Sequence, residues 1–215
     1  MGPEIVTLDP VHPEPAFARC SDVIRAGGVI AYPTDTFYGL GADPRNPDAV
    51  KSLFAIKGRP VGQPILLLLQ DRSMVREWAA EITAEAEALL DAFWPGPLTL
   101  IFTALPAVLQ ELTGGTGHIG LRVPGNDVTR RLLAALGTAL TGTSANRSGG
   151  PDLQTAQDVA GMLGERVDLI LDAGETPGGK PSSVVDVSAA GLTMVREGAV
   201  SNRALRDALH KFKKA

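Results

Sequence analysis

The sequence predicts an α/β protein in which an open, mixed β-sheet carries helices on its faces. Short aliphatic runs alternate with segments of helical periodicity along almost the whole chain, which is typical of βα units. Near the C-terminus several strands follow one another too closely for helical crossovers, so those pairs are expected to be antiparallel. No Gly/Ser-rich or Pro-rich linker and no fixed-period repeat divides the 215 residues. We therefore expect a single domain over residues 1–215.

Eight short runs are predicted to be strands. The run Ile65–Leu69 is aliphatic throughout, which indicates a central strand buried on both faces. In His118–Val123, apolar residues alternate with Arg122, as expected of a strand with two different faces. Residues 1–13 contain three prolines and are expected to form an extended lead-in. The predicted strands are Val29–Tyr32, Ile65–Leu69, Leu98–Phe102, His118–Val123, Thr138–Gly142, Leu169–Asp172, Ser183–Val187 and Thr193–Arg196.

Seven segments have helical patterns. In Asn46–Ile56, a proline suits the first turn, and Val50, Leu53 and Phe54 form one apolar stripe. The lone Cys20 lies on such a stripe and is expected to be a core residue. The predicted helices are Ala16–Ala26, Asn46–Ile56, Arg72–Trp78, Thr83–Ala92, Asp127–Leu136, Gln154–Leu163 and Asn202–Lys213.

Polar residues follow the first predicted strand at the point where it ends. Pro33 stops the ladder because it has no N–H to donate, and Thr34, Asp35 and Thr36 come next. In α/β proteins ligands bind where strands stop at their carboxyl ends. An ordinary strand–turn–helix connection uses the same residue types and is the alternative.

The helix that follows ends in Lys57, Gly58, Arg59 and Pro60. A cation in the last turn, a glycine after it and a proline beyond form a good helix stop, which accounts for Lys57 and Gly58. This explanation does not account for Arg59. Two cations after a strand that ended in hydroxyls therefore point to an anionic ligand.

Composition narrows the class of protein. The net charge is −4, so nucleic-acid binding would need a local basic patch. A single cysteine excludes an internal disulfide and fits a reducing compartment. No run is long and apolar enough to span a membrane, and the N-terminus has no signal-peptide pattern. We expect a cytoplasmic protein that does not contact membranes.

Residues 174–180 fit the pattern G-x-x-x-x-G-K, but they do not predict a P-loop. A P-loop continues with Ser or Thr and a helix, whereas here Pro181 and a strand-like run follow. We expect a loop at this position that is not a P-loop, and a mobile loop near a nucleotide is the alternative.

Six short blocks, in order from about residue 24 to 200, resemble the YrdC/Sua5 family of threonylcarbamoyl-AMP synthases. Any one block is weakly specific, but six in order are highly specific. The resemblance implies a YrdC-like α/β fold, a twisted mixed sheet with a large concave, positively charged cavity. It also implies that L-threonine, bicarbonate and ATP form threonylcarbamoyl-AMP and diphosphate, for the t6A modification of tRNA. The blocks are YPTDTFYGLG (32–41), KGRP (57–60), FWPGPLTL (93–100), LRVP (121–124), TSAN (143–146) and SSVVD (182–186).

The resemblance also assigns residues. Lys57 and Arg59 match the family's Lys-x-Arg motif and would be catalytic. With Ser144, Asn146 and Arg196 they would bind ATP. Thr36, Arg122 and Ser182 would hold threonine, and the hydroxyls of Thr34 and Thr143 belong to the same predicted threonine site. Mg²⁺ would arrive on the ATP with few protein ligands, so no protein metal site is predicted.

The residue inventory fits this chemistry independently. A threonine carbamate that attacks the α-phosphate crowds several negative charges into one site, which calls for cations and N–H or O–H donors rather than a nucleophile. The chain has such cations and hydroxyls, and it has no Ser-His-Asp order, metal-ligand cluster or telling carboxylate pair.

Two positions depart from the family pattern. Some members have His where this chain has Leu68, and Thr where it has His118. The first departure affects the expected polar wall of the amino-acid pocket, and the second affects one expected ATP contact. Because the chain ends at residue 215, we expect the short form without the extra domain of longer Sua5 proteins. Expected partners are the downstream tRNA threonylcarbamoyl transfer machinery and a weak contact with tRNA or other RNA.

Three other functions remain open at this point. The same fold forms a carbamoyl-transfer module inside much longer hydrogenase-maturation proteins. An RNA-binding protein could use the cavity for a phosphate backbone, although the chain lacks interleaved aromatic and basic residues. A regulatory nucleotide-binding protein would keep the cavity without turnover.

Overall fold

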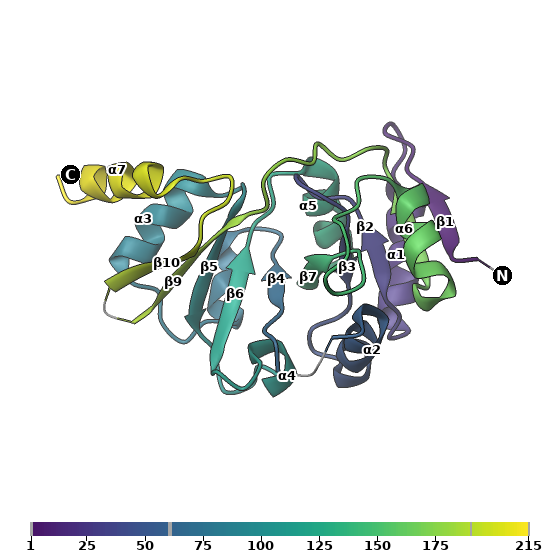
Figure 1. Cartoon of the computed structure of the whole chain (residues 1–215), viewed down its shortest axis with the longest axis horizontal. Coiled ribbons are helices and arrows are strands. Elements are labelled where there is room, and N and C mark those ends of the chain that lie inside the picture. The colour runs from purple at the N-terminus through teal and green to yellow at the C-terminus, as the bar shows by residue number, and fades with distance from the viewer. Residues whose placement is uncertain (1, 60–61, 190, 215) are drawn as a thin grey trace.

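The computed structural model describes residues 2–59, 62–189 and 191–214, so Pro60 of the predicted Lys-Gly-Arg-Pro block lies outside the described residues. Within this part of the chain ten strands form one sheet, in the order β1-β8-β2-β3-β7-β4-β6-β5-β9-β10 (Figure 1). The strands are β1 Glu4–Thr7, β2 Ile30–Tyr32, β3 Gly39–Gly41, β4 Leu66–Leu68, β5 Leu98–Thr103, β6 His118–Arg122, β7 Leu140–Ser144, β8 Leu169–Asp172, β9 Ser183–Ala189 and β10 Gly191–Arg196.

Side-chain caps start several of the helices. The Asn46 side chain accepts hydrogen bonds from the backbone N–H groups of Asp48 and Ala49, and Thr83 and Thr155 cap two later helices in the same way. The α-helices are α1 Glu14–Arg25, α2 Pro47–Lys57, α3 Ala84–Phe93, α4 Gln110–Thr113, α5 Asp127–Leu136, α6 Ala156–Leu163 and α7 Asn202–Phe212, and the 3₁₀ helices are η1 Arg72–Glu77 and η2 Gly164–Arg166.

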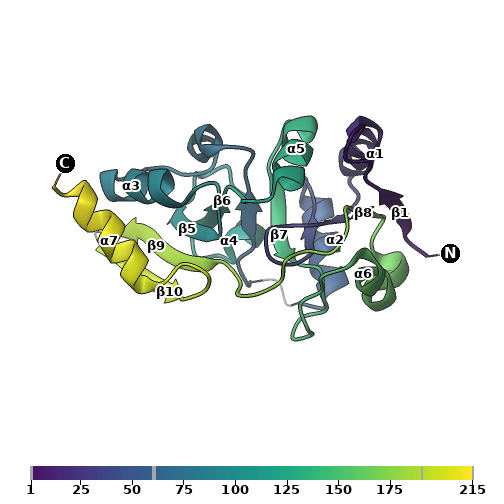
Figure 2. The same cartoon turned by 90° about the horizontal axis from the view of Figure 1, so that it is seen from above.

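The sheet is mixed, as predicted. Strands β5 and β9 pair in parallel, whereas β5–β6 and β9–β10 are antiparallel pairs. The first and last strands of the sheet come from opposite ends of the chain, and the two termini lie at opposite ends of the long axis (Figures 1 and 2).

Buried side chains form two apolar clusters. The smaller one joins α1 and α5 to residues of β2, β7 and β8 and contains Cys20, which is confirmed as a core residue. The larger one contains Val50, Leu53 and Phe54 of α2 together with α3, α6 and most of the sheet. In β2, Ala31 belongs to the larger cluster and Ile30 to the smaller, so this strand is buried on both faces.

The structure corrects two local predictions and adds two elements that were not predicted. Residues 1–13 are not only a lead-in, because Glu4–Thr7 forms β1, which pairs in parallel with β8. The Gly-rich segment after the polar turn is strand β3, inserted between β2 and β7. The segment predicted as helix 72–78 is the 3₁₀ helix η1, and the short helix α4 was not predicted. Pairing with distant strands determines that β1 and β3 form, and the periodicity of the sequence carries no information about that pairing.

Candidate active site

A cavity of about 680 Å³ lies along the sheet, from β3 to β10. Its floor follows from the alternation of side chains along strands. In β6, Gly120 and Arg122 line the cavity, whereas Leu121 between them packs in the larger core cluster. Strands β4, β5 and β9 alternate in the same way, and the register places Leu68 beside Arg122. The alternation predicted for His118–Val123 therefore gives this face of the sheet its polar surface.

Of the ten site residues predicted from the sequence, eight line this cavity, although they come from segments far apart in the chain. These are Thr34, Thr36, Arg59, Arg122, Thr143, Ser144, Ser182 and Arg196. Lys57 and Asn146 do not belong to the lining; they are buried behind it. No ligand contact tests the individual roles, so these assignments stay predictions.

Arg122 is held rigidly at the end of β6. Its side chain is 6% exposed, and its guanidinium donates from Nε to the Gly96 carbonyl oxygen at 2.9 Å and forms an ion pair through Nη2 with Asp35. The other oxygen of the Asp35 carboxylate accepts from the backbone N–H of Gly125 at 3.2 Å. The guanidinium donors outside these bonds can serve an acidic ligand, since the cavity reaches this side chain.

The polar turn after β2 is built by its own hydroxyls. Thr34 donates from Oγ1 to the Phe37 carbonyl oxygen at 2.7 Å, and the same atom accepts from the backbone N–H of Thr36 at 3.2 Å. The two threonine hydroxyl oxygens lie 3.2 Å apart. This local network, rather than a ligand, shapes the turn, and both side chains still face the cavity.

A second cluster of hydroxyl side chains, Thr99 and Ser182, lies where β5, β9 and β10 meet. The Ser182 hydroxyl lies 3.1 Å from the Thr99 hydroxyl, and the Arg196 guanidinium donates to the Ser182 carbonyl oxygen at 2.8 Å. Burial lowers the pKa of Arg196, and Asp152 opposes this shift. A guanidinium is charged at neutral pH, so Arg196 places a cation beside two hydroxyls, an arrangement suited to an anion.

Arg59 supplies the third arginine of the lining. It bonds Gln63 and the Pro64 carbonyl oxygen, and burial lowers the pKa of its guanidinium. Two carboxylates, Asp152 and Asp186, also line the cavity. The cavity therefore holds three cations and several hydroxyls against two carboxylates.

Several lining residues were not predicted from the sequence. Asp152, Thr99 and Asp186 are examples: Thr99 and Asp186 lie on the cavity face of β5 and β9, and only the strand register reveals this. Both positions that depart from the family pattern, Leu68 and His118, also line the cavity. The buried Nδ1 of His118 has no hydrogen-bond partner among the described residues, so the wall carries one unsatisfied polar atom there.

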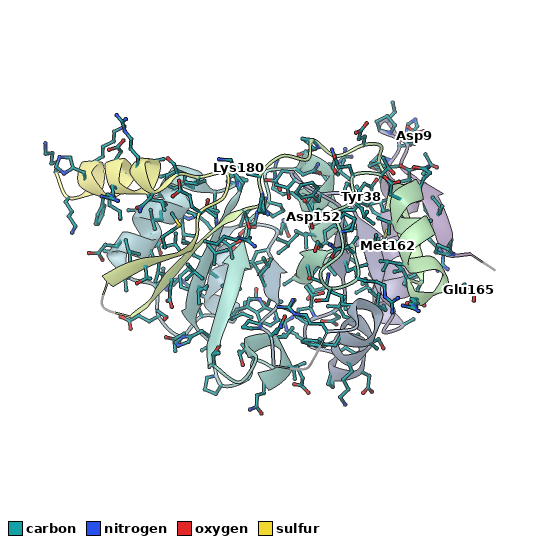
Figure 3. All side chains as sticks on the ribbon, viewed as in Figure 1. Asp9, Tyr38, Asp152, Met162, Glu165 and Lys180 are labelled. Carbon is teal, nitrogen blue, oxygen red and sulfur yellow. The ribbon has the colours of Figure 1, made fainter. Side chains whose placement is uncertain are left out.

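The segment 174–180 is a loop that leads into β9 rather than into a helix, so the rejection of a P-loop is confirmed. It is tied down at several points: the Gly178 N–H donates to the Thr36 carbonyl oxygen at 2.7 Å, and the Tyr38 hydroxyl donates to the Gly174 carbonyl oxygen at 2.8 Å. In Figure 3, Tyr38 and Asp152 lie in the middle of the molecule, below the segment that carries Lys180. The Lys180 side chain is exposed.

The described residues lack a metal-binding cluster and a membrane-spanning helix. They contain no group of three or more His, Cys, Asp or Glu side chains arranged to hold a metal ion. None of their helices has the length and apolar character needed to cross a bilayer.

A family model described as "Telomere recombination", which represents Sua5, YciO and YrdC proteins, matches residues 22–198. The chain belongs to the Sua5/YciO/YrdC family. The matched range agrees closely with the span of the six sequence blocks, and the resemblance noted from those blocks is thereby confirmed.

Named relatives of this family are similar over most of the chain. A threonylcarbamoyl-AMP synthase of Pyrococcus abyssi is 36% identical over 175 residues, which is 81% of this chain but 52% of the relative. The synthase of Thiobacillus denitrificans is 37% identical over 165 residues, 77% of this chain and 87% of the relative. A crystal structure of P. abyssi Sua5 complexed with L-threonine matches with a TM-score of 0.91 and 32% identity, covering 95% of this chain and 60% of that one. The chain thus spans about half the length of the archaeal relative and most of the bacterial one.

Proposed function

We propose that this chain is an L-threonylcarbamoyladenylate synthase, a nucleotidyltransferase that forms threonylcarbamoyl-AMP from L-threonine, bicarbonate and ATP. The observation that carries this proposal is the convergence of Arg59, Arg122 and Arg196 with five predicted hydroxyl residues on one cavity. The printed names of its relatives, and the threonine complex of one of them, support the same activity.

The reaction needs charge stabilisation more than covalent chemistry. The threonine nitrogen first forms a bond to the carbon of bicarbonate; the carbon–hydroxyl bond breaks, and the hydroxyl leaves as water with a proton from the nitrogen, so that a carbamate results. An oxygen of that carbamate then forms a bond to the α-phosphorus, and the bond from this phosphorus to the bridging oxygen breaks to release diphosphate. Arginines around the cavity would neutralise the triphosphate and the threonine carboxylate, and rigid hydroxyls would orient them. Mg²⁺ would enter with the ATP.

The product, an acyl adenylate, would pass to the downstream tRNA threonylcarbamoyl transfer machinery for t6A formation. A cytoplasmic location and a weak contact with tRNA or other RNA are part of the same proposal.

The proposal is tested by measuring diphosphate release from Mg·ATP with threonine and bicarbonate present together, singly or absent. We expect release only when both are present. Diphosphate release that is indifferent to threonine would contradict the synthase activity. Nucleotide binding without turnover would favour a regulatory protein, and RNA binding alone would favour an RNA-binding module.

A further inference from the structure

Lys57 lies behind the cavity wall, although the motif predicts a catalytic cation. The residue is 4% exposed, and its Nζ donates three hydrogen bonds: to the Ser144 carbonyl oxygen at 2.6 Å, and to the carbonyl and side-chain oxygens of Asn146, both at 3.0 Å. An ammonium has three donors, so these oxygens use all of them. No donor is left for a phosphate in this arrangement.

The backbone of Lys57 also forms a hydrogen bond with the loop that contains Ser144 and Asn146. Its carbonyl oxygen accepts from the N–H of Ser148 at 2.9 Å. Gly58 then turns the chain in a left-handed conformation, with φ at 60°. This turn separates the two cations of the motif, because Arg59 reaches the cavity lining and Lys57 does not.

Asn146 connects Lys57 to the rest of the loop 144–152 by hydrogen bonds. Its Oδ1 accepts from Lys57 Nζ and from the Ser144 hydroxyl, the latter at 2.7 Å. Its Nδ2 donates to the carbonyl oxygens of Gly150 and Pro151, at 2.7 and 3.0 Å. The two ends of this loop, Ser144 and Asp152, both line the cavity.

We propose that Lys57 is a positioning residue: its ammonium fixes the 144–152 loop through Asn146, so that Ser144 and Asp152 form one wall of the cavity, and it does not touch the nucleotide. The nucleotide in this statement rests on the proposed function. The hold on the loop rests on geometry alone and exists before any ligand binds.

Hydrogen exchange of the ligand-free protein tests the hold on the loop. In K57M the amide hydrogens of Ser148 and Gly150 should exchange at least about tenfold faster, because the bonds lost involve a charged donor. The matched control is K51M on the same helix, whose ammonium is exposed and pairs with Asp48 at 3.4 Å; it should change neither amide. If K57M does not fold, K57Q keeps an amide donor at this position and gives a milder form of the same effect. Unchanged exchange in the loop would overturn the proposal.

Mg·ATP affinity measured by calorimetry tests the route through Asn146. K57M and N146A should each weaken binding by about tenfold, and the double variant should bind no more than about threefold more weakly than the weaker single variant, since both act on one network. Effects that multiply, or an unchanged affinity in K57M, would show that Lys57 does not work through Asn146. If the wild-type protein binds no ATP, the proposed function fails, while the exchange measurement still decides the role of Lys57.

Discussion

At the scale of single residues, Arg122 combines burial, a fixed ion pair and access to the cavity. The side chain of its partner Asp35 is 17% exposed, so neither charge is well hydrated. A charge that loses such a partner in a buried site costs about 3–5 kcal/mol, which is more than the loss of an exposed pair.

We expect Arg122→Gln to lower kcat/KM for threonine by about 10²-fold or more, the scale of one lost contact to a charged substrate group. The free energy of unfolding in urea should fall by about 3 kcal/mol, because Asp35 is left unpaired. Asp35→Asn combined with Arg122→Gln should recover part of the stability but not the activity. Recovery of activity in the double variant would show that the guanidinium serves only Asp35.

The position of Lys57 predicts that Mg·ATP affinity depends on pH. Burial lowers the pKa of its ammonium from 10.5 to about 8, with Arg59 acting in the same direction and Asp152 opposing it. Above this pKa the neutral amine has only two hydrogens for three acceptors. Mg·ATP affinity of the wild type should therefore fall between about pH 7.5 and 9.5, whereas K57M should show no such fall.

The sign of the stability change separates this effect from unfolding. Because the pKa of Lys57 is lower in the folded state, the unfolded chain binds more protons between about pH 8 and 10.5. This group therefore raises the free energy of unfolding as the pH rises through that window. A fall in affinity that tracks a loss of folded protein would contradict the assignment to Lys57.

At the scale of elements, the turn between β10 and α7 supports the segment that carries Ser182 and its neighbouring hydroxyls. The Gly198 N–H donates to the Ser183 hydroxyl at 2.9 Å, and the Ala199 N–H donates to the Pro181 carbonyl oxygen at 3.0 Å. A methyl group on Gly198 would lie 2.1 Å from that same Pro181 oxygen, which is backbone and cannot turn aside. The close approach therefore requires glycine.

We expect Gly198→Ala to lower the free energy of unfolding by about 2 kcal/mol and to weaken threonine binding, because the 181–183 segment must move. Gly161→Ala is the matched control: Gly161 lies within α6, and a methyl group there meets no atom within 4 Å. This control should raise stability by up to about 1 kcal/mol through helix propensity. Thermal unfolding of both variants measures the contrast, and equal effects would argue against the steric explanation.

At the scale of the whole molecule, the cavity extends from the middle of the sheet to one edge. Its lining draws on β3 and β7, in the middle of the strand order, and on β9 and β10 at the edge. The lining residues range from Tyr32 to Arg196. Ligand binding should therefore stabilise the fold as a unit rather than one local part.

Threonine at about 100 times its Kd should add about 2.7 kcal/mol to the free energy of unfolding and raise the Tm by roughly 5–10 °C, as binding to the folded state alone requires.

Serine lacks one methyl group and should be used with a kcat/KM about 10–200-fold lower than threonine, the range for one methyl in an apolar pocket. Calorimetric unfolding and competition kinetics measure the two effects. Equal use of both amino acids would exclude a fitted methyl pocket.

The sequence by itself determined the local features of this protein. The proline in the first turn of α2, the alternation around Arg122 and the termination of β2 at Pro33 depend on neighbouring residues only, so spacing and residue type were sufficient to predict them. The six blocks identified the family for the same reason, since each is a short contiguous pattern.

Only the tertiary structure decided which of the predicted residues meet. Lys57 and Arg59 are two positions apart, yet one bonds a loop nearly ninety residues away and the other lines the cavity. Strand β1 pairs with β8 from a distant part of the chain, and Asp152 lines the cavity from a loop in which Asn146 donates a hydrogen bond to the Pro151 carbonyl oxygen. The physical reason is that the cost of burying a polar group depends on the partner it finds, and those partners come from distant parts of the chain.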